Sequence, residues 1–436
     1  MSYLIYQVTD KPKRLREWFG YTIQYIFAVL PATILISQIC GTSIAAGLIS
    51  AGLGTLVFLA ITSMKVAMVT SNSGATVSAI VGAIALSNAV EKDFTGVVLG
   101  GAVMMIIYAI AAIFVKQFGT RWLDKLMPPI VSGTTIIVIG ASLTLFIPGY
   151  AMINGQVSLI GLGLCFFTMI CAAIIAHYAR GIWKTLPFLG ALIIGDIVAI
   201  ILSACGVEGI MDLGSIIPKT VVSMPDFAFL HLDFAHFNWT NLPNILLMFG
   251  LVSLAAMTEH VADVKTASEI AESNYIKEPG LHRTLLGDGV SSFVGTLTGA
   301  QCTTTYSEYT GTMAVSRVAS SWITFATSLS LIALAFITPF TNFLATLPNC
   351  VFAGVAICAY GMIANTGVKT LINSRIDFSV NRNIFIFAGM FSAGISGLAI
   401  PINDNFSISG IVLAMIVGIV LNLILRDPKF AKSRKK

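Results

Sequence analysis

Three carboxylates stand out by their position: Glu259, Asp263 and Glu308 lie in segments that otherwise resemble membrane helices. An ionisable side chain at membrane depth costs several kcal/mol, and it usually lines a water-filled cavity or a path for protons or substrate. Glu259 and Asp263 are four residues apart, so on a helix they share a face. Two carboxylates this close in a low dielectric cannot both ionise cheaply, so we expect one of them to hold a proton near neutral pH. The pattern predicts an acidic transport site that is coupled to protons.

The same residues restrict the ligand. Glu308 directly follows the polar run TTTYS at 303–307. Carboxylates beside backbone N–H groups match a ligand that carries ring N–H donors next to carbonyl acceptors, as a pyrimidine or an oxopurine base does. An anionic substrate would favour Arg or Lys, and no basic residue falls at this depth of the predicted spans. The plainest alternative is that Glu259 and Glu308 only form structural hydrogen bonds between helices.

Composition places these carboxylates in a polytopic membrane protein. Of the 436 residues, 56% are hydrophobic and only 10% are charged, and the mean hydropathy is +0.88, whereas soluble domains carry about 25% charged residues. Apolar stretches near the roughly 20 residues that a helix needs to cross a bilayer recur along the whole length. We predict fourteen spans. The first seven are at about 20–38, 44–62, 66–82, 95–117, 129–147, 157–178 and 186–205. The second seven are at about 245–263, 283–300, 304–317, 321–338, 349–368, 384–401 and 406–425.

The basic residues test this count, because Lys and Arg collect in cytoplasmic loops. With a cytoplasmic N-terminus, only Lys92 and Lys219 of the 25 Lys and Arg residues fall on the outer side. We therefore expect a multi-pass protein of the cytoplasmic (inner) membrane with both termini in the cytoplasm. The basic tail at 426–436 is interpreted as an anchor at the anionic lipid surface rather than as a nucleic-acid-binding segment.

Internal order predicts two inverted repeats. An odd number of spans in each half reverses the orientation of the second half, and such repeats place a substrate site at their interface. The predicted organisation is a cytoplasmic segment at 1–19, spans 1–7 at 20–206, an extracytoplasmic loop at 207–244, spans 8–14 at 245–425 and the tail at 426–436.

The third span of each half differs from its neighbours. Residues 68–80 and 302–315 are rich in Ser, Thr and Gly. Such runs at membrane depth indicate interrupted helices that line a cavity. Each is expected to end in a half-helix whose N-terminal amides can donate to a carbonyl oxygen of the ligand.

Other functions find little support in the residues. There is no phosphate-binding glycine loop, nucleophile elbow or metal-ligand cluster, and the seven cysteines form no CxxC pair. No enzyme activity, metal or cofactor is expected. The proton gradient is expected to supply the coupling ion. Asp196 and Asp288 are lone acids that packing or capping would explain, and His260 could simply be a neighbour of Glu259. Asp263 could be a solvated residue at the cytoplasmic end of its helix.

Five stretches resemble one transporter family over essentially the whole chain. They are QYIFAV at 24–29, PPIVSG at 128–133, EHVAD at 259–263, GDGVSS at 287–292 and TTYSEYTGTMAVSR at 304–317. These stretches are similar to the nucleobase-ascorbate transporter family, also called nucleobase:cation symporter-2, with bacterial uracil permeases as the nearest likeness. The resemblance implies a core domain of spans 1–4 and 8–11, a gate domain of spans 5–7 and 12–14, and a short strand before the half-helix in spans 3 and 10. It also implies proton-coupled import of a base by alternating access, and a homodimer formed through the gate domain.

The resemblance places the base between the two half-helices. The residues that it implies bind the base are Glu259, Glu308, Ser73, Gly74, Ser307, Tyr306 and Tyr25. The residues that it implies couple protons are Glu259, Asp263 and Asp288.

Several positions depart from the uracil permease pattern. Tyr25 and Asp263 stand where uracil permeases have His, Tyr309 replaces the motif's Asn, and Gly74 stands where an aromatic residue is common. Asp263 is similar to purine-transporting members, whereas Glu308 is similar to the uracil branch. A glycine at position 74 is expected to widen the site. We therefore expect uracil as the first substrate and xanthine or another oxopurine as the second, with an anion transporter of the same fold class or a channel as more remote alternatives.

Overall fold

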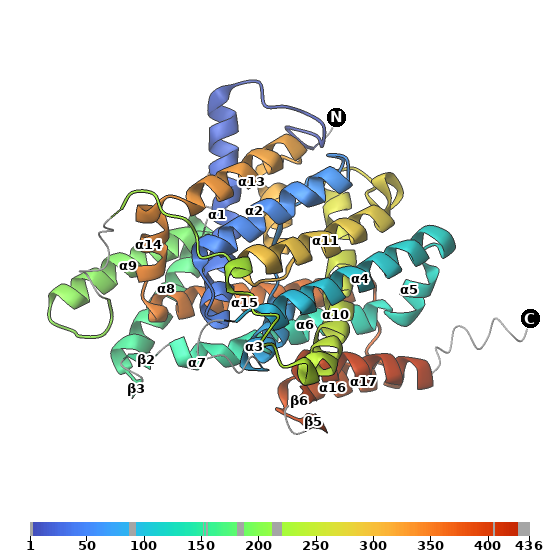
Figure 1. The fold of residues 1–436 in the computed structure, drawn as a ribbon. Coiled ribbons are helices and arrows are strands. Elements are labelled where there is room, and N and C mark those ends of the chain that lie inside the picture. Colours follow the sequence, from blue (N-terminus) through green and yellow to red (C-terminus); the bar gives the residue numbers. More distant parts are fainter. Residues whose placement is uncertain are drawn as a thin grey trace, which may run out of the picture.

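The computed structural model describes residues 3–86, 93–150, 152–153, 156–180, 187–211, 220–403 and 406–425, and it consists mainly of helices (Figure 1). The helices of the first half are α1 (Leu15–Cys40), α2 (Ile44–Ile61), α3 (Val77–Leu86), α4 (Thr95–Phe118), α5 (Arg121–Leu126), α6 (Pro129–Leu143), α7 (Ile147–Tyr150), α8 (Leu159–Tyr178) and α9 (Pro187–Ala204). The helices of the second half are α10 (Leu242–Ile270), α11 (Leu281–Gly299), α12 (Ser307–Ser316), α13 (Ser321–Ala335), α14 (Thr338–Thr346), α15 (Asn349–Asn373), α16 (Asn381–Ile395) and α17 (Gly410–Ile424). The antiparallel strand pairs are β1 (Thr70–Asn72) with β4 (Thr303–Thr305), β2 (Met152–Ile153) with β3 (Gln156–Val157), and β5 (Ala399–Asn403) with β6 (Phe406–Ser409).

Local sequence signals set several helix ends. Ser43 caps α2, because its Oγ accepts a hydrogen bond from the Ala46 N–H at 3.3 Å. Gly41 ends α1 in the left-handed conformation, with φ at +64°. Helix α6 begins at Pro129, where a proline fits the first turn, and α15 follows Pro348.

The helices are those of a membrane protein. In the described part of the chain, eight helices are long and apolar enough to cross a membrane by length and composition. Three shorter apolar helices, at α3, α13 and α17, extend this set. Every predicted span overlaps a helix or a strand that leads into one. The structure thus confirms the predicted all-α polytopic class, with short strands in spans 3 and 10.

Three predicted boundaries are wrong. The end of span 13 and the start of span 14 form the β5–β6 hairpin, where Pro401 lacks the N–H that a continuing helix would need. Helix α10 continues to Ile270 instead of stopping at Asp263. Asp263 therefore lies about two turns inside the helix and is only 3% exposed, so it is not a solvated helix end.

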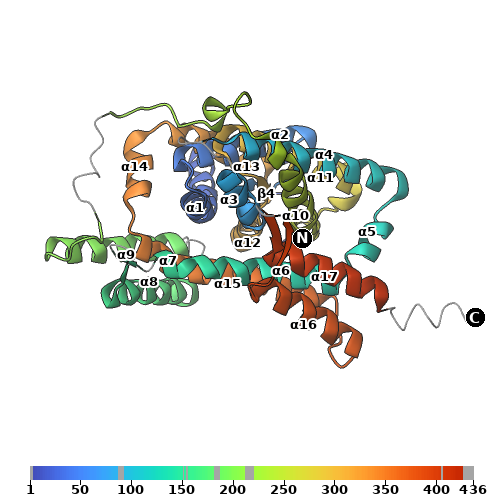
Figure 2. The ribbon, with the colours of Figure 1, turned by 60° about the horizontal axis from the view of Figure 1, so that its bottom comes forward.

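The helices form two layers (Figure 2). One layer contains α1–α4 and α10–α13, and the other contains α6, α8, α9 and α15–α17, with the most extensive packing inside each layer. Helices cross closely where both carry glycine: a Cβ on Gly367 of α15 would lie 2.4 Å from the carbonyl oxygen of Gly133 on α6. The two layers are the core and gate domains that the sequence resemblance implies.

The packing has the two-fold pattern of inverted repeats. Helix α4 packs along α11 as α2 packs along α13, and α8 packs on α9 as α16 packs on α17. The gate pair α15–α8 corresponds in the same way to α6–α16. Strands β1 and β4 lie antiparallel, with Ser71 opposite Thr304 at the middle of the ladder. A two-fold axis through this middle pair exchanges the halves and makes Asn72 equivalent to Thr305.

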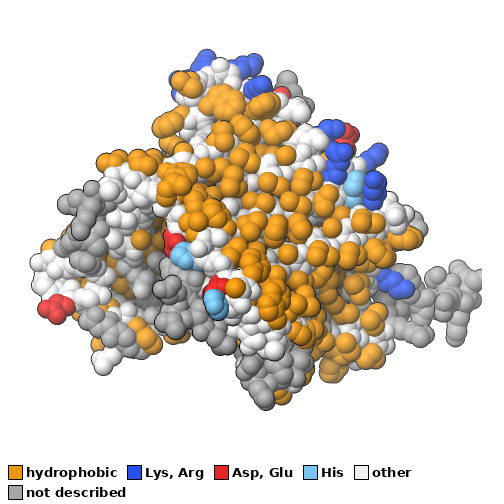
Figure 3. Space-filling model, viewed as in Figure 1, with side chains coloured by type: hydrophobic (Ala, Val, Ile, Leu, Met, Phe, Trp, Pro, Cys, Tyr) orange, Lys and Arg blue, Asp and Glu red, His pale blue; other side chains and the backbone are white. Residues whose placement is uncertain are grey.

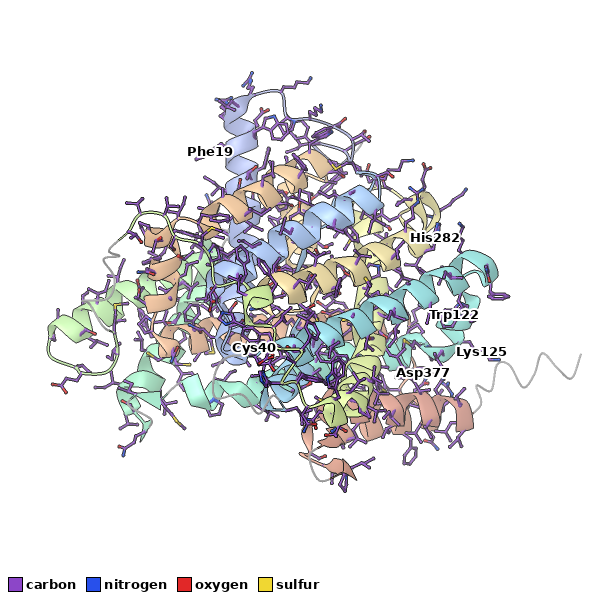
Figure 4. All side chains as sticks on the ribbon, in the orientation of Figure 1. Phe19, Cys40, Trp122, Lys125, His282 and Asp377 are labelled. Atoms are coloured by element: carbon purple, nitrogen blue, oxygen red, sulfur yellow. The ribbon has the colours of Figure 1, made fainter. Side chains whose placement is uncertain are left out.

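Charge is unevenly spread over the surface. Hydrophobic side chains cover most of the face in Figure 3, and Lys and Arg gather along its upper and right-hand edges. Figure 4 labels Trp122, Lys125, His282 and Asp377 along the right-hand side of the molecule. This separation is typical of a protein whose basic loops share one side of a membrane. The tail at 426–436, Lys92 and Lys219 lie outside the described residues.

Candidate functional site

The site is built around the strand pair β1–β4. All six residues of the two strands have polar side chains, and all are buried against α1, α2, α10 and α11. After β1, the 3-10 turn Gly74–Thr76 leads into α3, and after β4 the chain enters α12 through Tyr306. The two half-helices therefore start at opposite ends of one short ladder, and each offers N–H groups that its first turn leaves free.

Two aspartates hold the β4 end of this ladder. Asp288 on α11 is completely buried and accepts hydrogen bonds from the Thr305 N–H and the Thr304 hydroxyl, each at 3.0 Å. Asp263 on α10 accepts from the Thr305 hydroxyl at 3.3 Å and from the Ser307 hydroxyl. The structure thus brings together three residues that the sequence singled out, Asp263, Asp288 and Ser307. Asp288 anchors a strand rather than only packing one helix against another.

His260 joins the two aspartates. Its completely buried ring has Nδ1 3.2 Å from Asp288 Oδ2 and 3.3 Å from Thr305 Oγ1. Nε2 lies 3.0 Å from Thr284 Oγ1 on α11. From the sequence, His260 was interpreted only as a neighbour of Glu259. The signal that indicated a larger role is the position of this histidine between the two acids of the EHVAD motif.

Glu259 and Glu308 are half-buried and come from different elements. Glu259 Oε2 on α10 is buried and has no hydrogen-bond partner in the described part of the chain. A buried acceptor left unpaired costs about 1–3 kcal/mol. Glu308 lies in the first turn of α12, where the helix dipole favours a carboxylate. An N–H donor on a bound ligand would offset the cost at Glu259.

The first half contributes Ser73 and Gly74. The Ser73 N–H donates to the Cys302 carbonyl at 2.9 Å, and its buried Oγ has no partner among the described residues. A Cβ on Gly74 would lie 2.9 Å from Cδ1 of Leu143 on α6. Leu143 of the gate domain therefore fills the space beside Gly74, and the widening predicted from this glycine is not present in this structure.

The tyrosines occupy two separate places. The Tyr25 ring stacks on Tyr309 with 4.4 Å between ring centroids, and its hydroxyl donates to the Val318 carbonyl at 2.6 Å. This hydroxyl lies 3.0 Å from Ser316 Oγ, at the C-terminal end of α12. Tyr306 instead sits at the N-terminal end of the same helix and is 9% exposed. The role of both residues in substrate binding stays a prediction.

A second polar group of residues, which the sequence did not predict, lies at the other end of the ladder. This amide cluster consists of Asn72, Gln301, Ser37 and Thr42. Gln301 Nε2 donates to the Ser37 hydroxyl at 2.8 Å and to the Thr42 hydroxyl. The Asn72 amide and Gln301 Oε1 are buried without a partner in the part of the chain described. A Cβ on Gly47 of α2 would lie only 2.7 Å from Ser37 Oγ, so the cluster depends on that glycine.

A cavity of about 250 Å³ separates the core and gate layers along α10. Its α10 wall is Thr258, Val261, Ala262, Lys265, Thr266 and Glu269. Its other wall is Met127, Pro129, Ser132, Thr370, Asn373 and Ser374. The α10 residues recur every three or four positions, so they form one stripe beside the face that carries Glu259 and Asp263. The stripe runs about 16 Å from the level of these carboxylates toward the C-terminal end of the helix.

The fold and the site together define an integral membrane transporter built from two inverted repeats that meet at buried polar strands. The chain matches the sequence model Xan_ur_permease, the Permease family, over residues 16–403. It belongs to this family.

Individual relatives agree with this assignment. The chain is 31% identical to the uracil permease of Bacillus caldolyticus over 431 residues, 98% of this chain and 95% of that protein. It is 30% identical to the uracil permease of Bacillus subtilis (95% and 93% covered) and 27% identical to that of Escherichia coli K12 (96% and 93% covered).

Solved structures share the fold. The transmembrane domain of the cyanobacterial bicarbonate transporter BicA has a TM-score of 0.66 at 16% identity, covering 95% of this chain and 99% of that one. SLC26A9 has a TM-score of 0.65 at 12% identity, covering 94% of this chain and 66% of that one.

Proposed function

We propose that this protein imports a nucleobase, uracil in the first place, together with protons across the cytoplasmic membrane. The uracil permeases that it resembles cover the chain almost from end to end, which supports the substrate class. The structural observation that carries the proposal is Glu259 Oε2, a buried acceptor without a partner in the described part of the chain. Glu259 lies on α10, and Asp263 of the same helix accepts a hydrogen bond from the Ser307 hydroxyl at the start of α12.

A pyrimidine dione meets the chemistry of this region. Its ring N–H groups would donate to the carboxylates of Glu259 and Glu308. Its carbonyl oxygens would accept from the Ser73 hydroxyl and from the N–H groups at the starts of α3 and α12. An inorganic anion would instead meet like charge, which argues against anion transport in spite of the shared fold. Asp263 keeps an oxopurine as the second candidate.

Proton coupling is supported by the crowding of acids. Glu259, Asp263 and Asp288 lie on two adjoining helices in a buried region, where several negative charges are expensive. A proton entering with the base lowers that cost. The cavity along α10 then offers the base a way out at the helix end that the basic residues assign to the cytoplasm. Movement of the core layer against the gate layer would close this cavity and open the opposite side.

The test compares bases and one variant. Thermal-shift measurements with uracil, thymine, xanthine and hypoxanthine should show stabilisation by uracil first, since a ligand that binds only the folded state raises the melting temperature. Glu259→Gln should lose uracil affinity by about 10–100-fold, because a neutral amide oxygen replaces a charged hydrogen-bond acceptor. Glu269→Gln, an exposed acid on the same helix in the cavity wall, is the matched control and should bind as the wild type does. Full concentrative uptake by Glu259→Gln, or silence with every base, would contradict the proposal.

A further inference from the structure

One hydroxyl stands between two groups that can hold a proton. Thr305 Oγ1 is 3.3 Å from Asp263 Oδ2 and 3.3 Å from His260 Nδ1. A hydroxyl has a single proton to donate and two lone pairs to accept with. Thr305 can therefore donate to only one of these neighbours at a time, and it can accept a hydrogen bond from the other.

The hydrogen bonds around His260 fix which ring nitrogen is available. Thr284 Oγ1 donates to the Leu281 carbonyl at 3.1 Å, so toward His260 it acts as an acceptor and Nε2 carries a hydrogen. In the neutral ring, Nδ1 is then a bare lone pair, 3.2 Å from Asp288 Oδ2. Two acceptors at this distance need a proton between them, unless Thr305 donates to Nδ1.

The other carboxylate oxygens already accept hydrogen bonds, and Asp288 Oδ2 keeps a lone pair for one more donor. Asp288 holds the Thr305 N–H and the Thr304 hydroxyl, and Asp263 Oδ1 takes the Ser307 hydroxyl. Asp263 Oδ2 and His260 Nδ1 are thus the two positions between which a proton can be placed. Thr305 Oγ1 is within hydrogen-bonding distance of both.

We propose that Thr305 is the bridge over which one proton passes between Asp263 and His260, an inference that rests on the proton-coupled transport proposed above. In the first arrangement, Asp263 Oδ2 carries the proton and donates it to Thr305, while Thr305 donates to His260 Nδ1. In the second, His260 carries a proton on both nitrogens and donates from Nδ1 to Asp288, while Thr305 donates to the Asp263 carboxylate. The proton of Asp263 moves to Thr305 as the proton of Thr305 moves to His260, so the net charge of the network stays the same.

The surroundings leave Thr305 as the connection between these two groups. Among the described residues, the titratable group nearest His260 is Asp288 on α11. The ring of Tyr108 on α4 lies 6.5 Å from the imidazole, and α2 places the Phe58 ring at the same distance. Glu259 and Asp263 share helix α10 with His260, and Glu308 lies in the first turn of α12. His260, Thr305, Asp263 and Asp288 are at most 3% exposed. The bridge moves the proton from Asp263 to the pair of His260 and Asp288, and Asp288 also holds the backbone of β4.

The experiment removes the bridging hydroxyl and keeps its shape. Thr305→Val should retain uracil binding and uracil–uracil exchange. Two properties should change: proton-driven net uptake should fall by about tenfold or more, and the uptake that remains should lose the wild-type dependence on pH. Thr305→Ser should restore both. Thr303→Val is the matched control, because Thr303 is equally buried on the same strand and its hydroxyl lies 3.1 Å from Ser291 Oγ, apart from the network.

A second variant and a second readout keep the outcome decisive. His260→Gln can still donate to Thr284 but cannot hold the proton, so it should show the same selective loss if Thr305→Val folds poorly. The band of protonated carboxyl groups in infrared difference spectra between acidic and alkaline pH needs no substrate. If no base is carried but this band changes in Thr305→Val and not in Thr303→Val, the transport function fails and the bridge stands. Wild-type bands or wild-type pH dependence of uptake in Thr305→Val would overturn the bridge.

Discussion

The two ends of the β1–β4 ladder are equivalent in the fold and different in chemistry. At the β4 end, Thr305 lies among His260, Asp263 and Asp288. At the equivalent position of β1, Asn72 lies with the neutral hydroxyl and amide groups of the amide cluster. Both ends are buried, and at each end a strand turns into a half-helix. One end is therefore surrounded by acids and the other by neutral polar groups.

The helices next to the strands show where the halves diverge. Thr55 on α2 donates to the carbonyl of the first residue of β1, and Ser292 on α11 does the same for β4. One turn earlier, α11 carries Asp288 and α2 carries Ala51. The strand-anchoring hydroxyl is thus common to both repeats, whereas the buried acid belongs to the second repeat. We infer that the first repeat mainly supports the ladder and that the second carries the proton chemistry.

The largest effect should come from Asp288→Asn, which gives the second repeat a neutral group like that of the first. Asp288 accepts hydrogen bonds from the Thr305 N–H and the Thr304 hydroxyl, and one of these two donors would then face the NH₂ group of the amide. A buried donor without an acceptor costs about 1–3 kcal/mol of unfolding free energy. Proton-driven uptake should fall to background and the melting temperature should drop. Proteoliposome uptake and thermal unfolding measure the two effects.

Asp196→Asn is the control for this substitution. Asp196 is a buried acid of the gate helix α9, and its Oδ1 has no partner in the part of the chain described. Uptake and melting temperature should stay at wild-type values. If Asp288→Asn transported as well as Asp196→Asn, the acidic end of the ladder would be no more than a structural anchor.

Much of this architecture can be predicted from the sequence, because hydropathy and polar interruptions are local signals. The polar stretches at 68–80 and 302–315 predict interrupted helices that end in half-helices, and the family resemblance implies a short strand before each. The structure has both features. The four-residue spacing in EHVAD puts Glu259 and Asp263 on one helix. The hairpin β5–β6 was missed because its residues are apolar enough to pass for a membrane helix.

Long-range partners could not be predicted. His260 and Asp288 lie on different helices, and hydropathy gives no distance between helices. The contact of Gly74 with Leu143 depends on how the gate packs against the core, so the sequence suggested a wider site than the structure has. Gln301 and Ser37 are 264 residues apart, and the tertiary fold brings them together beside the β1–β4 pair.

A smaller effect is expected from Gly47→Ala, which crowds the amide cluster. The new Cβ would lie 2.7 Å from Ser37 Oγ and 3.3 Å from Gln301 Nε2. Such overpacking costs about 1–3 kcal/mol of unfolding free energy, and the protein that remains folded should keep the wild-type pH dependence of uptake. Gly163→Ala on α8 is the control, since a Cβ there meets nothing within 4 Å. A changed pH profile in Gly47→Ala alone would give the first repeat a share in proton coupling.

The smallest effect is expected at an ion pair outside both clusters. Lys65 lies 2.6 Å from Glu278, both side chains are exposed, and the hydrogen bond and charge of Lys65 lower the pKa of Glu278. A carboxyl whose pKa is lower in the folded state stabilises the fold above its ordinary pKa, and this contribution is lost as pH falls through the lowered value. Exposed pairs contribute little, so Glu278→Gln should lower the melting temperature only slightly at neutral pH and not at all in acid. A drop as large as that of Gly47→Ala would mean that the loops, and not the buried ends of the ladder, control stability.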